Sequence, residues 1–528
     1  MSIVALLERG RRLSPDGVAL KAGSMVLTYD EFVDAVVRTG YALRQIGFGP
    51  GDRIAVAAPN DPAALIASFS VMAAGATYVP VSSIYSTLEM RSVLERFDCG
   101  AFIYHDSLRS AVGSFHDDLA DRLIFFRIDS SVGGDVDDAG KTAGDASFDS
   151  LREDIAAGPD QLPSPRLTDI AWLGLTGGTT GLPKGVMISW AALNAFIQKF
   201  TAEFTSSSPR MLMSAPLTHA AGILSMAGLS RGATVVVTNG VNPPEFLSLI
   251  EQERITETML PPTGIYKLLD HPDVGRYNYS SLTNFLYGAA PMSVRRLREA
   301  IATFGPVLTE IYGQTECHTM ITVMRPEEHF VGRDVDGALA DDSVLASCGR
   351  PSIGTVVEIR DDDAIPLPRG ELGEVCVSSD LNMSGYFNNP EETASTLRDG
   401  FVHTGDIGFL DDDGRLHIVD RKKDMVITGG FNVYPAEVES VLQRRPEIVD
   451  CAVVGISDDY WGEVLVAAVQ LADGAVLDTE QITMDLRDEL GVVKTPKHFV
   501  VMAQLPQSGV GKILKSSVRQ LVTDRIRA

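Results

Sequence analysis

The sequence has few cysteines, no excess of basic residues and no long apolar run, and each of these absences excludes a class of protein. Five cysteines are scattered through 528 residues and form no Cys-x-x-Cys pair. This pattern predicts reduced thiols in a cytoplasmic protein rather than a disulfide framework or a zinc site. The apolar run at residues 3–7 is too short for a signal peptide, and Ser and Gly interrupt the longest apolar stretch, residues 65–81. We therefore expect neither a secreted protein nor a membrane span.

Acidic residues outnumber basic ones, 70 to 45, which gives a formal net charge of −25. An acidic body does not favour a nucleic-acid-binding surface, and any polyanion must be bound by local lysines and arginines. Hydrophobic residues make up 45% of the chain and charged residues 22%, as in globular proteins. A chain of this length exceeds a single core, so two or more domains are expected.

The order of apolar patterns predicts an α/β fold. Over most of the first 400 residues, short apolar runs typical of strands alternate with patterns typical of helices. This alternation predicts parallel sheets flanked by helices. The Gly-, Asp- and Ser-rich stretch 130–165 is expected to be a surface excursion. The predicted strands include 53–58, 76–81, 233–237 and 257–260, and the predicted helices include 61–74 and 243–253.

The pattern then changes to short β-like runs that follow one another. They predict a small antiparallel or barrel-like part, about 346–420, at the end of an N-terminal domain of residues 1–420. Asp420–Asp424 are five consecutive charged residues, which fit either a hinge or a solvated turn. Residues 425–528 show an α/β alternation of their own and have a length that suits a small domain. We predict a hinge at 421–424 between the two domains.

A glycine-rich stretch, residues 175–186, carries the strongest local signal. Its glycines let the backbone turn tightly and bring N–H groups close to an anion, while its threonines and Lys184 add donors and a positive charge. The stretch follows a strand-like run and suits the β- and γ-phosphates of a nucleotide. The Leu-Pro pair before Lys184 and the glycine after it distinguish the stretch from a Walker A loop. An ordinary flexible surface loop is the alternative.

Three further clusters hold side chains suited to a nucleotide. Tyr287–Pro291 is a small-residue turn on whose backbone a flat ring could lie. Tyr312–Glu316 contains an aromatic ring for a base, a hydroxyl for a phosphate and a carboxylate for Mg²⁺. His403–Asp406 is a turn whose aspartate could accept both ribose hydroxyls. Taken singly, the three also fit a tight strand-to-helix connection, an N-cap and ordinary turn chemistry.

Two basic residues complete the set of candidates. Arg421 could contact ribose or phosphate, and a solvated surface arginine is the alternative. Lys512 is framed by glycines near the C-terminus and could reach into a site on another domain. Taken in isolation, such a lysine is more often a plain surface residue.

The order and spacing of these clusters resemble the adenylate-forming superfamily, which includes acyl-CoA synthetases, adenylation domains and luciferases. The resemblance extends from about residue 25 to the C-terminus, and several independent matches in one order make it specific. It implies a large N-terminal domain of stacked α/β sheets with a small β-barrel, and a small, mobile α+β C-terminal domain. The matching segments are Leu175–Gly185, Tyr287–Pro291, Tyr312–Glu316, Thr404–Asp406, Asp420–Asp424, Gly429–Glu439 and Gly511–Lys512.

The resemblance also implies a reaction in two halves. A carboxylate attacks the α-phosphate of ATP, which gives an acyl-adenylate and pyrophosphate, and a thiol, usually that of CoA, then displaces AMP. Such chemistry needs no nucleophile from the enzyme, so positioning and charge neutralisation supply the catalysis. Between the halves the C-terminal domain would rotate about Lys423, withdrawing Lys512 and presenting Gly430.

The resemblance assigns a role to individual residues. Lys512 would bridge the carboxylate and the α-phosphate, Thr315 would hold the α-phosphate, and Glu316 would ligate Mg²⁺. The nucleotide would be held by Thr176, Gly177, Gly178, Thr179, Thr180, Gly181, Lys184, Gly288, Ala289, Ala290, Tyr312, Gly313, Asp406 and Arg421. The acyl pocket would involve His219, Ala221, Gly222, Tyr287, Gly288 and Gly313, and the CoA site Gly429, Gly430, Trp461 and Lys494.

The sequence departs from the family pattern at two places that bear on CoA. Pro506–Ser508 replaces the Pro-Arg-Thr that often precedes the catalytic lysine, which removes one positive charge. The run before Pro496 lacks the aromatic residue and arginine common in CoA users, so Lys494 and Lys497 are the candidates for the CoA phosphates. Trp461 fits either packing against CoA or a half-buried surface aromatic.

Together these observations predict an acid–thiol ligase that uses ATP, Mg²⁺ and CoA. The small residues after His219 leave room for a bulky acyl group, and no cation is placed for a second carboxylate. We expect a hydrophobic monocarboxylate, aryl or medium-chain fatty, with an aromatic or bulky acid favoured. The alternative is an enzyme that loads a separate carrier protein; luciferase-like oxidation is least favoured, and a purely binding role would leave the Lys512 loop unexplained. No nucleic-acid partner is expected, and a homodimer stays open.

Overall fold

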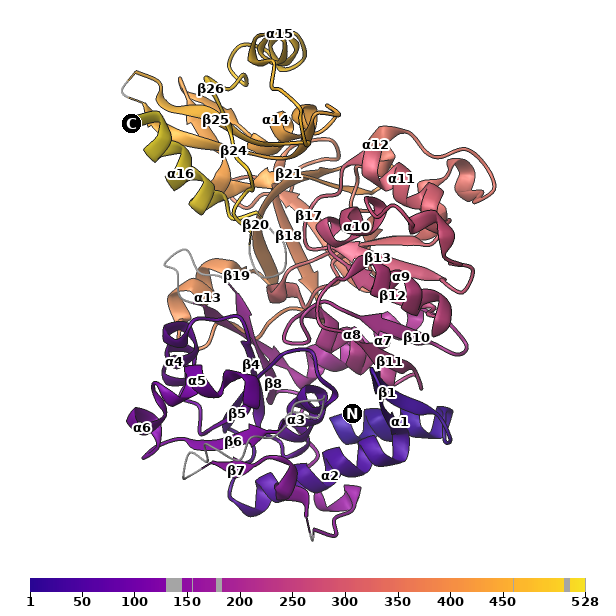
Figure 1. Cartoon of the computed structure of the whole chain (residues 1–528). Helices are drawn as coiled ribbons and strands as arrows, with labels where there is room; N and C mark the ends of the chain where they lie inside the picture. The colour runs from indigo at the N-terminus through magenta and orange to yellow at the C-terminus, as the bar shows by residue number, and fades with distance from the viewer. Residues whose placement is uncertain (130–144, 154, 177–182, 459, 508–512, 528) are drawn as a thin grey trace.

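The computed structural model describes residues 1–129, 145–153, 155–176, 183–458, 460–507 and 513–527. Within these residues the strands form four sheets of nine, seven, five and five strands (Figure 1). Helices flank the two larger sheets, which confirms the predicted α/β fold. The fourth sheet and its helices lie together at the top of the view in Figure 1.

Most strand pairs of the two larger sheets are parallel, and the antiparallel pairs lie at both edges of the nine-stranded sheet and at one edge of the seven-stranded sheet. The antiparallel pairs are β1–β2, β14–β15, β15–β16 and β8–β9. The nine-stranded sheet has the order β16 (Arg350–Pro351), β15 (Thr322–Met324), β14 (Leu308–Tyr312), β13 (Asn284–Gly288), β12 (Glu257–Leu260), β10 (Arg210–Met213), β11 (Thr234–Val237), β1 (Val18–Ala22) and β2 (Met25–Thr28). The seven-stranded sheet has the order β7 (Ala146–Ser147), β6 (Ile124–Ile128), β5 (Ala101–His105), β3 (Arg53–Ala58), β4 (Thr77–Ser82), β8 (Ile170–Thr176) and β9 (Lys184–Ser189).

Several helices of this region begin at a residue whose side chain caps the first turn, and the helix that starts at Pro62 is an example. Asp61 accepts a hydrogen bond from the Ala63 backbone N–H at 2.8 Å, and Pro62 occupies the first helical position. The helices are α1 (Ile3–Leu13), α2 (Tyr29–Gln45), α3 (Pro62–Ala73), α4 (Thr87–Arg96), α5 (Arg109–Gly113), α6 (His116–Leu119), α7 (Trp190–Glu203), α8 (Ala220–Leu229), α9 (Pro243–Gln252), α10 (Pro262–Leu269), α11 (Val294–Phe304), α12 (Asp342–Leu345) and α13 (Pro390–Thr396).

One apolar core joins the two larger sheets. It contains side chains from β3, β8, β10, β11, α2, α3, α7 and α8. Side chains alternate between the faces of a strand, so on β13 Leu286 lies in this shared core while Tyr287 lies in a second core on the opposite face. Any side chain that serves a site between the sheets must therefore sit on the shared-core face.

The third sheet is antiparallel, as the pattern after residue 346 predicts. The long central strand of this sheet is β20 (Phe401–Leu410). It pairs with β18 along one edge and with β19 and β21 along the other. The strands are β17 (Thr355–Arg360), β18 (Gly373–Ser379), β20 (Phe401–Leu410), β19 (Leu397–Arg398) and β21 (Leu416–Arg421). A 3₁₀ turn, Lys422–Asp424, separates this sheet from the fourth.

The fourth sheet and three helices form the C-terminal part. The strands are β23 (Phe431–Val433), β22 (Val426–Thr428), β25 (Gly462–Leu471), β24 (Ile448–Asp458) and β26 (His498–Val501), and the helices are α14 (Pro435–Leu442), α15 (Thr479–Leu490) and α16 (Lys515–Arg527). A polar junction ties this part to β21. Asp420 accepts a hydrogen bond from the Ala436 backbone N–H at 2.8 Å, and the Lys515 ammonium lies 2.9 Å from Glu439 and 3.9 Å from Asp420.

The stretch predicted as a surface excursion, 130–165, supplies part of the seven-stranded sheet. Residues 130–144 and 154 lie outside the described residues, but β7 pairs with β6 at the edge of that sheet. Phe148 follows at once and is fully buried. Phe148 is thus a buried aromatic residue in a stretch whose composition is typical of a loop.

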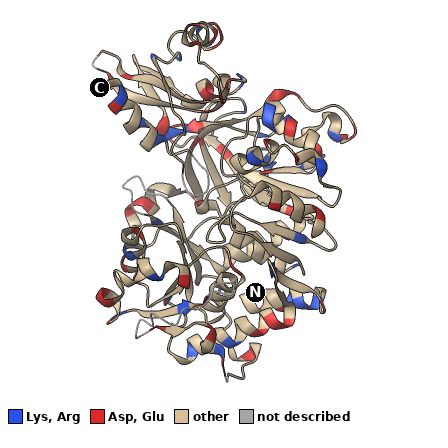
Figure 2. Ribbon diagram, viewed as in Figure 1, with Lys and Arg blue, Asp and Glu red and all other residues tan. Residues whose placement is uncertain are grey.

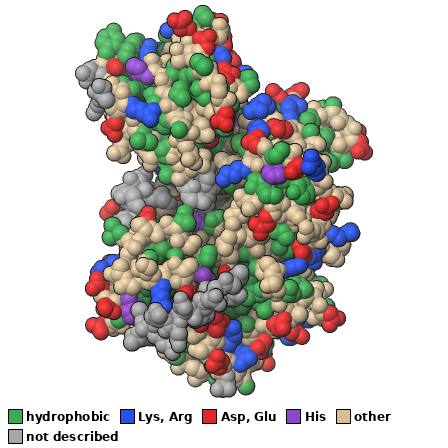
Figure 3. Space-filling view, viewed as in Figure 1, with side chains coloured by type: hydrophobic (Ala, Val, Ile, Leu, Met, Phe, Trp, Pro, Cys, Tyr) green, Lys and Arg blue, Asp and Glu red, His purple; other side chains and the backbone are tan. Residues whose placement is uncertain are grey.

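Charged side chains are distributed over the whole molecule. Figure 2 shows Lys and Arg among the Asp and Glu side chains on most helices, and Figure 3 shows the same mixture on the visible face. In the part of the chain that the structure describes, no helix combines the length and the apolar character needed to cross a membrane.

A buried ion pair lies beside the nine-stranded sheet. The Arg231 guanidinium lies 2.5 Å from the Glu257 carboxylate, and the Glu257 side chain is fully buried. Arg231 also donates to the Phe204 carbonyl and lies over the Phe200 ring, 5.1 Å from its centroid. Neither charge has water as an alternative partner, so each depends on the other.

We predict that Glu257→Gln lowers the free energy of unfolding by about 3–5 kcal/mol, because it leaves Arg231 buried without a counter-charge. Urea unfolding followed by circular dichroism measures this. The control is Asp118→Asn, which breaks the exposed Arg91–Asp118 pair and should change stability by less than about 1 kcal/mol. Equal effects of the two substitutions would contradict the assignment.

Candidate active site

The best-defined part of the site is a buried carboxylate where two sheets meet. Asp406 of β20 accepts a hydrogen bond from the Tyr312 hydroxyl at 2.5 Å and lies 2.5 Å from the Nε of Arg421. Asp406 and Arg421 are direct partners in the β20–β21 ladder, and Tyr312 ends β14 of the nine-stranded sheet. Residues that lie 94 positions apart in the sequence are therefore joined through one side chain.

The Tyr312 hydroxyl is the donor of this cluster, and the Asp406 carboxylate is the acceptor. Burial and the neighbouring Asp406 raise the pKa of the Tyr312 hydroxyl well above its usual value, so it remains protonated and donates. A carboxylate can accept more than one hydrogen bond, so Asp406 contacts a tyrosine hydroxyl and an arginine at once.

The loop after β14 connects this cluster to the seven-stranded sheet. The Gln314 amide donates to the Thr404 carbonyl at 3.3 Å, beside Asp406. On its other side the loop packs on β8: a Cβ at Gly174 would lie 2.3 Å from the methyl group of Thr315. Glycine at 174 thus permits a contact that any larger residue would block, and it brings Thr315 next to the strand that leads into the glycine-rich stretch.

Lys184 and Glu316 both contact Tyr386, a residue that the motifs did not indicate. The Tyr386 hydroxyl donates to Glu316 at 2.9 Å, and the Lys184 ammonium lies 5.6 Å from the centre of the Tyr386 ring. Lys184 also pairs with Glu392 of α13. Burial and Glu316 raise the pKa of Tyr386, which keeps it a donor. Tyr386 and Glu392 were missed because they lie in a polar segment without a recognisable spacing.

The small-residue turn after β13 has a structural requirement of its own. A Cβ at Gly288 would lie 2.2 Å from the Ile311 carbonyl oxygen, so glycine allows β13 and β14 to approach. Ala289 has a positive φ of 67° and is exposed, and Ala290 is half-buried. A Cβ at Gly313 would lie 2.2 Å from the Thr319 carbonyl oxygen, which explains the glycine after Tyr312.

The residues predicted for the acyl pocket are only partly brought together. His219 contacts the Thr218 hydroxyl at 3.0 Å, and burial lowers the pKa of its ring, so the imidazole is neutral. Ala221 is buried in the shared core. A Cβ at Gly222 would lie 2.1 Å from the Leu217 carbonyl oxygen. Tight packing of the chain on itself, rather than room for a ligand, thus explains the glycine at 222.

Tyr287 faces away from this region. Its ring lies in the second core, and its hydroxyl contacts Glu310 and His329 at 3.3 and 3.4 Å. Any contribution of Tyr287 to an acyl pocket would therefore come from its backbone. The period of two along β13, with Leu286 in the shared core, could have indicated this orientation.

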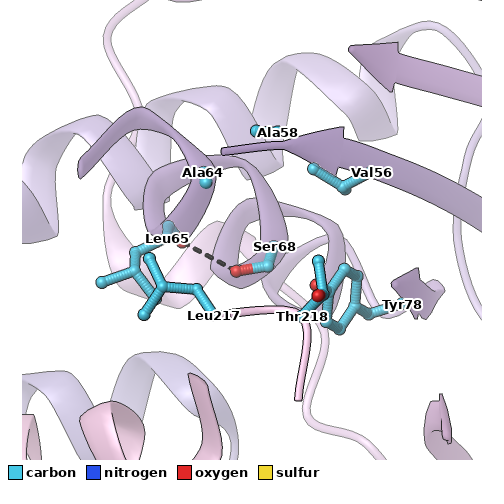
Figure 4. A pocket seen from close by; sticks show the side chains of 8 residues that line it. All are labelled: Val56, Ala58, Ala64, Leu65, Ser68, Tyr78, Leu217 and Thr218. Atoms are coloured by element: carbon cyan, nitrogen blue, oxygen red, sulfur yellow. Dashed lines mark hydrogen bonds between the residues drawn. The ribbon is translucent and has the colours of Figure 1, made fainter. Parts of the chain in front are cut away.

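A small cavity lies beside His219. Apolar side chains of β3 and α3 form most of it, with the Tyr78 ring and Thr218 at one side (Figure 4). The Ser68 hydroxyl donates a 3.1 Å hydrogen bond to the Leu65 carbonyl. The cavity is lined by Val56, Ala58, Ala64, Leu65, Ser68, Tyr78, Leu217 and Thr218.

The residues predicted to contact CoA lie on the C-terminal part. Gly429 and Gly430 form the two-residue turn between β22 and β23, and both have positive φ, 56° and 82°. Such a hairpin turn favours glycine whatever the ligand. Trp461 packs on Gly429 and has Lys497 over its ring, 5.3 Å from the centroid. Lys494 pairs with Glu437 at 2.7 Å.

Several predicted site residues cannot be placed. Gly177, Gly178, Thr179, Thr180, Gly181 and Lys512 lie outside the described residues. Their neighbours are described: Thr176 and Lys184 are partners in the β8–β9 ladder. The predicted hinge residue Lys423 is exposed in the turn between the third and fourth sheets.

The side chains around Glu316 suit a metal ion only when other ligands complete its coordination. Among the described residues, no three His, Cys, Asp or Glu side chains are placed to hold a metal ion together. Mg²⁺ is commonly held by one or two carboxylates together with phosphate oxygens and water. A single carboxylate at Glu316 suits this mode.

Comparison with known proteins agrees with the predicted family. The family model for AMP-binding enzymes matches residues 7–387, and the model for the AMP-binding enzyme C-terminal domain matches residues 437–512. A feruloyl-CoA synthase from Amycolatopsis sp is 35% identical over 519 residues, which cover 97% of each chain. A medium/long-chain-fatty-acid–CoA ligase from Mycobacterium tuberculosis is 41% identical over 352 residues, 65% of this chain and 60% of that relative.

A solved structure extends the likeness to the whole fold. The amide bond synthetase McbA from Marinactinospora thermotolerans is 30% identical, covers 98% of this chain and 99% of its own, and has a TM-score of 0.86. The chain therefore belongs to the AMP-binding enzyme family. It is an AMP-forming acyl-CoA synthetase of the adenylate-forming superfamily, as the motifs predicted.

We predict that Tyr386→Phe lowers kcat/KM for ATP by about 5- to 20-fold, because it removes a hydrogen bond to a carboxylate while keeping the ring beneath Lys184. Steady-state kinetics at several Mg²⁺ concentrations measure this, and the loss should be largest when Mg²⁺ is limiting. Tyr279→Phe is the matched control, since the Tyr279 hydroxyl contacts only the Val274 carbonyl among the described residues. An unchanged kcat/KM for Tyr386→Phe would contradict the role of this contact.

Proposed function

We propose that this protein activates a hydrophobic carboxylic acid, aryl or medium-chain fatty, with ATP and transfers the acyl group to CoA. The observation that carries the proposal is the convergence of Asp406, Tyr312 and Arg421 with the Thr315–Glu316 segment beside β8. These residues were predicted from three motifs: Tyr312, Thr315 and Glu316 from one, Asp406 from a second and Arg421 from a third. Family membership supports the reaction class, and the residue roles below belong to the proposal.

In the first half-reaction a carboxylate oxygen of the acid attacks the α-phosphorus of ATP. The bond from that phosphorus to the pyrophosphate oxygen breaks, and acyl-adenylate and pyrophosphate result. Asp406 and Arg421 would hold the ribose, Thr315 the α-phosphate, and Lys184 the pyrophosphate. Fixed positioning of this kind accounts for most of the catalysis that the reaction needs.

Three charged groups of the candidate site have partners within the chain. Lys184 pairs with Glu392, Arg421 with Asp406, and Glu316 with the Tyr386 hydroxyl. These contacts hold the three side chains in defined positions.

Glu316 would contribute one ligand to Mg²⁺, and the nucleotide phosphates and water would supply the rest. When bound, the ion would neutralise charge on the phosphates. The chain's own part is to orient the carboxylate, and the 2.9 Å hydrogen bond from Tyr386 does this.

In the second half-reaction the sulfur of CoA would attack the acyl carbonyl carbon. The bond from that carbon to the AMP oxygen breaks, and a thioester and AMP result. Gly429, Gly430 and Trp461 would lie along the pantetheine arm, and Lys494 near the CoA phosphates. We place the hinge of a mobile C-terminal domain, residues 425–528, at Lys423.

The proposal is tested by ATP–pyrophosphate exchange across a panel of aryl and fatty acids. Hydrophobic monocarboxylates should stimulate exchange, and free CoA should then accelerate AMP release. Acceleration by a pantetheinylated carrier protein instead of CoA would favour carrier loading. If neither CoA nor the carrier protein accelerates AMP release, both proposed acceptors are wrong. If no acid stimulates pyrophosphate exchange, acid activation itself is contradicted.

We predict that Lys512→Ala abolishes adenylate formation but spares thioester formation from a supplied acyl-adenylate. The reason is that only the first half-reaction needs a cation between the carboxylate and the α-phosphate. Rates of the two half-reactions, measured separately, test this. Lys515→Arg, which keeps its charge near Glu439 and Asp420, is a nearby control expected to retain both. Equal loss of both steps in Lys512→Ala would argue against the rotating domain.

A further inference from the structure

Three buried polar atoms near Thr315 have no hydrogen-bond partner among the described residues. They are both ring nitrogens of His318 and the indole Nε1 of Trp172. His318 is fully buried, and Trp172 is 8% exposed. Each unpaired buried polar group costs about 1–3 kcal/mol, whereas apolar side chains of similar shape would cost nothing. Three such atoms in one place point to a partner that the protein itself does not supply.

The His318 ring packs against the rings of Trp172 and Phe196 of α7, and these three rings are called the aromatic recess. The His318 ring lies 5.6 Å from the Trp172 ring and 5.1 Å from the Phe196 ring, edge to face in both cases. His318 has a positive φ of 43°, and its backbone N–H donates to the Thr315 carbonyl. Backbone geometry at the end of the Thr315 turn therefore directs the imidazole into this recess.

The recess can both donate and accept hydrogen bonds. Both ring nitrogens of His318 are unpaired among the described residues, and an imidazole can offer one N–H donor and one acceptor nitrogen. The indole of Trp172 adds a second N–H. A hydroxyl group, which donates once and accepts twice, would match this set.

The recess lies close to Thr315, which belongs to the predicted reaction centre. Thr315 packs on Gly174, and Trp172 precedes Gly174 by two residues on the same face of β8. Two residues of strand span about 6–7 Å. On the other side, Trp172 is the ladder partner of Tyr78, which lines the cavity beside His219 in Figure 4.

We infer that His318 and Trp172 form the polar end of the acid-binding pocket and select acids whose ring carries a hydroxyl or similar oxygen about 6–7 Å or more from the carboxylate. The inference rests on the proposed function and narrows its substrate class. The walls of Trp172 and Phe196 suit a flat ring. The imidazole would accept from the ring hydroxyl, and the indole N–H would donate to its oxygen.

The test is acid-dependent ATP–pyrophosphate exchange by the full chain with two matched pairs, benzoate with 4-hydroxybenzoate and cinnamate with 4-hydroxycinnamate. In at least one pair the wild type should favour the hydroxylated acid by tenfold or more in kcat/KM, because a site built for a hydroxyl rejects the analogue without it. Trp172→Phe and His318→Phe should each reduce that preference by about tenfold.

Two further measurements separate recognition from packing. Phe196→Leu alters the wall but keeps all three polar atoms, so it should affect both acids of a pair alike and leave the preference intact. Trp172→Phe removes an unpaired buried N–H, so its thermal midpoint should equal or exceed that of the wild type. A clear fall in the midpoint would indicate an ordinary packing role and overturn the inference.

The outcomes distinguish this inference from the proposed function. If no acid stimulates exchange, the proposed function fails and the inference with it. If acids stimulate exchange but the wild type shows no preference in either pair, the recess holds water only and the inference alone fails. Retention of the preference in both Trp172→Phe and His318→Phe would overturn it as well.

Discussion

The buried carboxylate of Asp406 is the contact on which the arrangement of the site depends. It joins Tyr312, the last residue of β14 in the nine-stranded sheet, to Arg421, the last residue of β21 in the third sheet. Without this carboxylate, the ends of β14 and β21 would lack a side chain that contacts both. The same carboxylate is the predicted ribose ligand.

The loop after Tyr312 extends this anchor to the seven-stranded sheet. Gln314 contacts the β20 turn, and Thr315 packs on Gly174. Glu316 is fixed from both ends, since its carbonyl accepts from Met383 and its carboxylate from Tyr386. Five residues of sequence thus touch three sheets.

The fold could be predicted from the sequence because it depends on local patterns. Strand and helix periodicity indicated the sheets, and the helix predicted at 61–74 corresponds to α3. The meeting of Tyr312, Asp406 and Arg421 was predictable only through the resemblance, since no local rule brings residues so far apart together.

Side-chain directions and internal partners were harder to predict. The small residues after His219 indicated an open pocket, but Gly222 is explained by the close Leu217 carbonyl. Tyr386 contacts Glu316, and Glu392 pairs with Lys184, but neither Tyr386 nor Glu392 belongs to a recognisable motif. The unpaired ring of His318 is visible only once burial and hydrogen bonds are known. Each of these depends on contacts between distant segments, which spacing along the chain does not report.

The most direct test of the account is acid-dependent ATP–pyrophosphate exchange in Asp406→Asn compared with the wild type, under conditions where both proteins are folded by circular dichroism. Loss of the carboxylate charge leaves Arg421 unpaired and removes the predicted ribose anchor. We expect kcat/KM for ATP to fall by more than about 100-fold, equivalent to about 3 kcal/mol. Exchange at the wild-type rate in a folded Asp406→Asn protein would contradict the account.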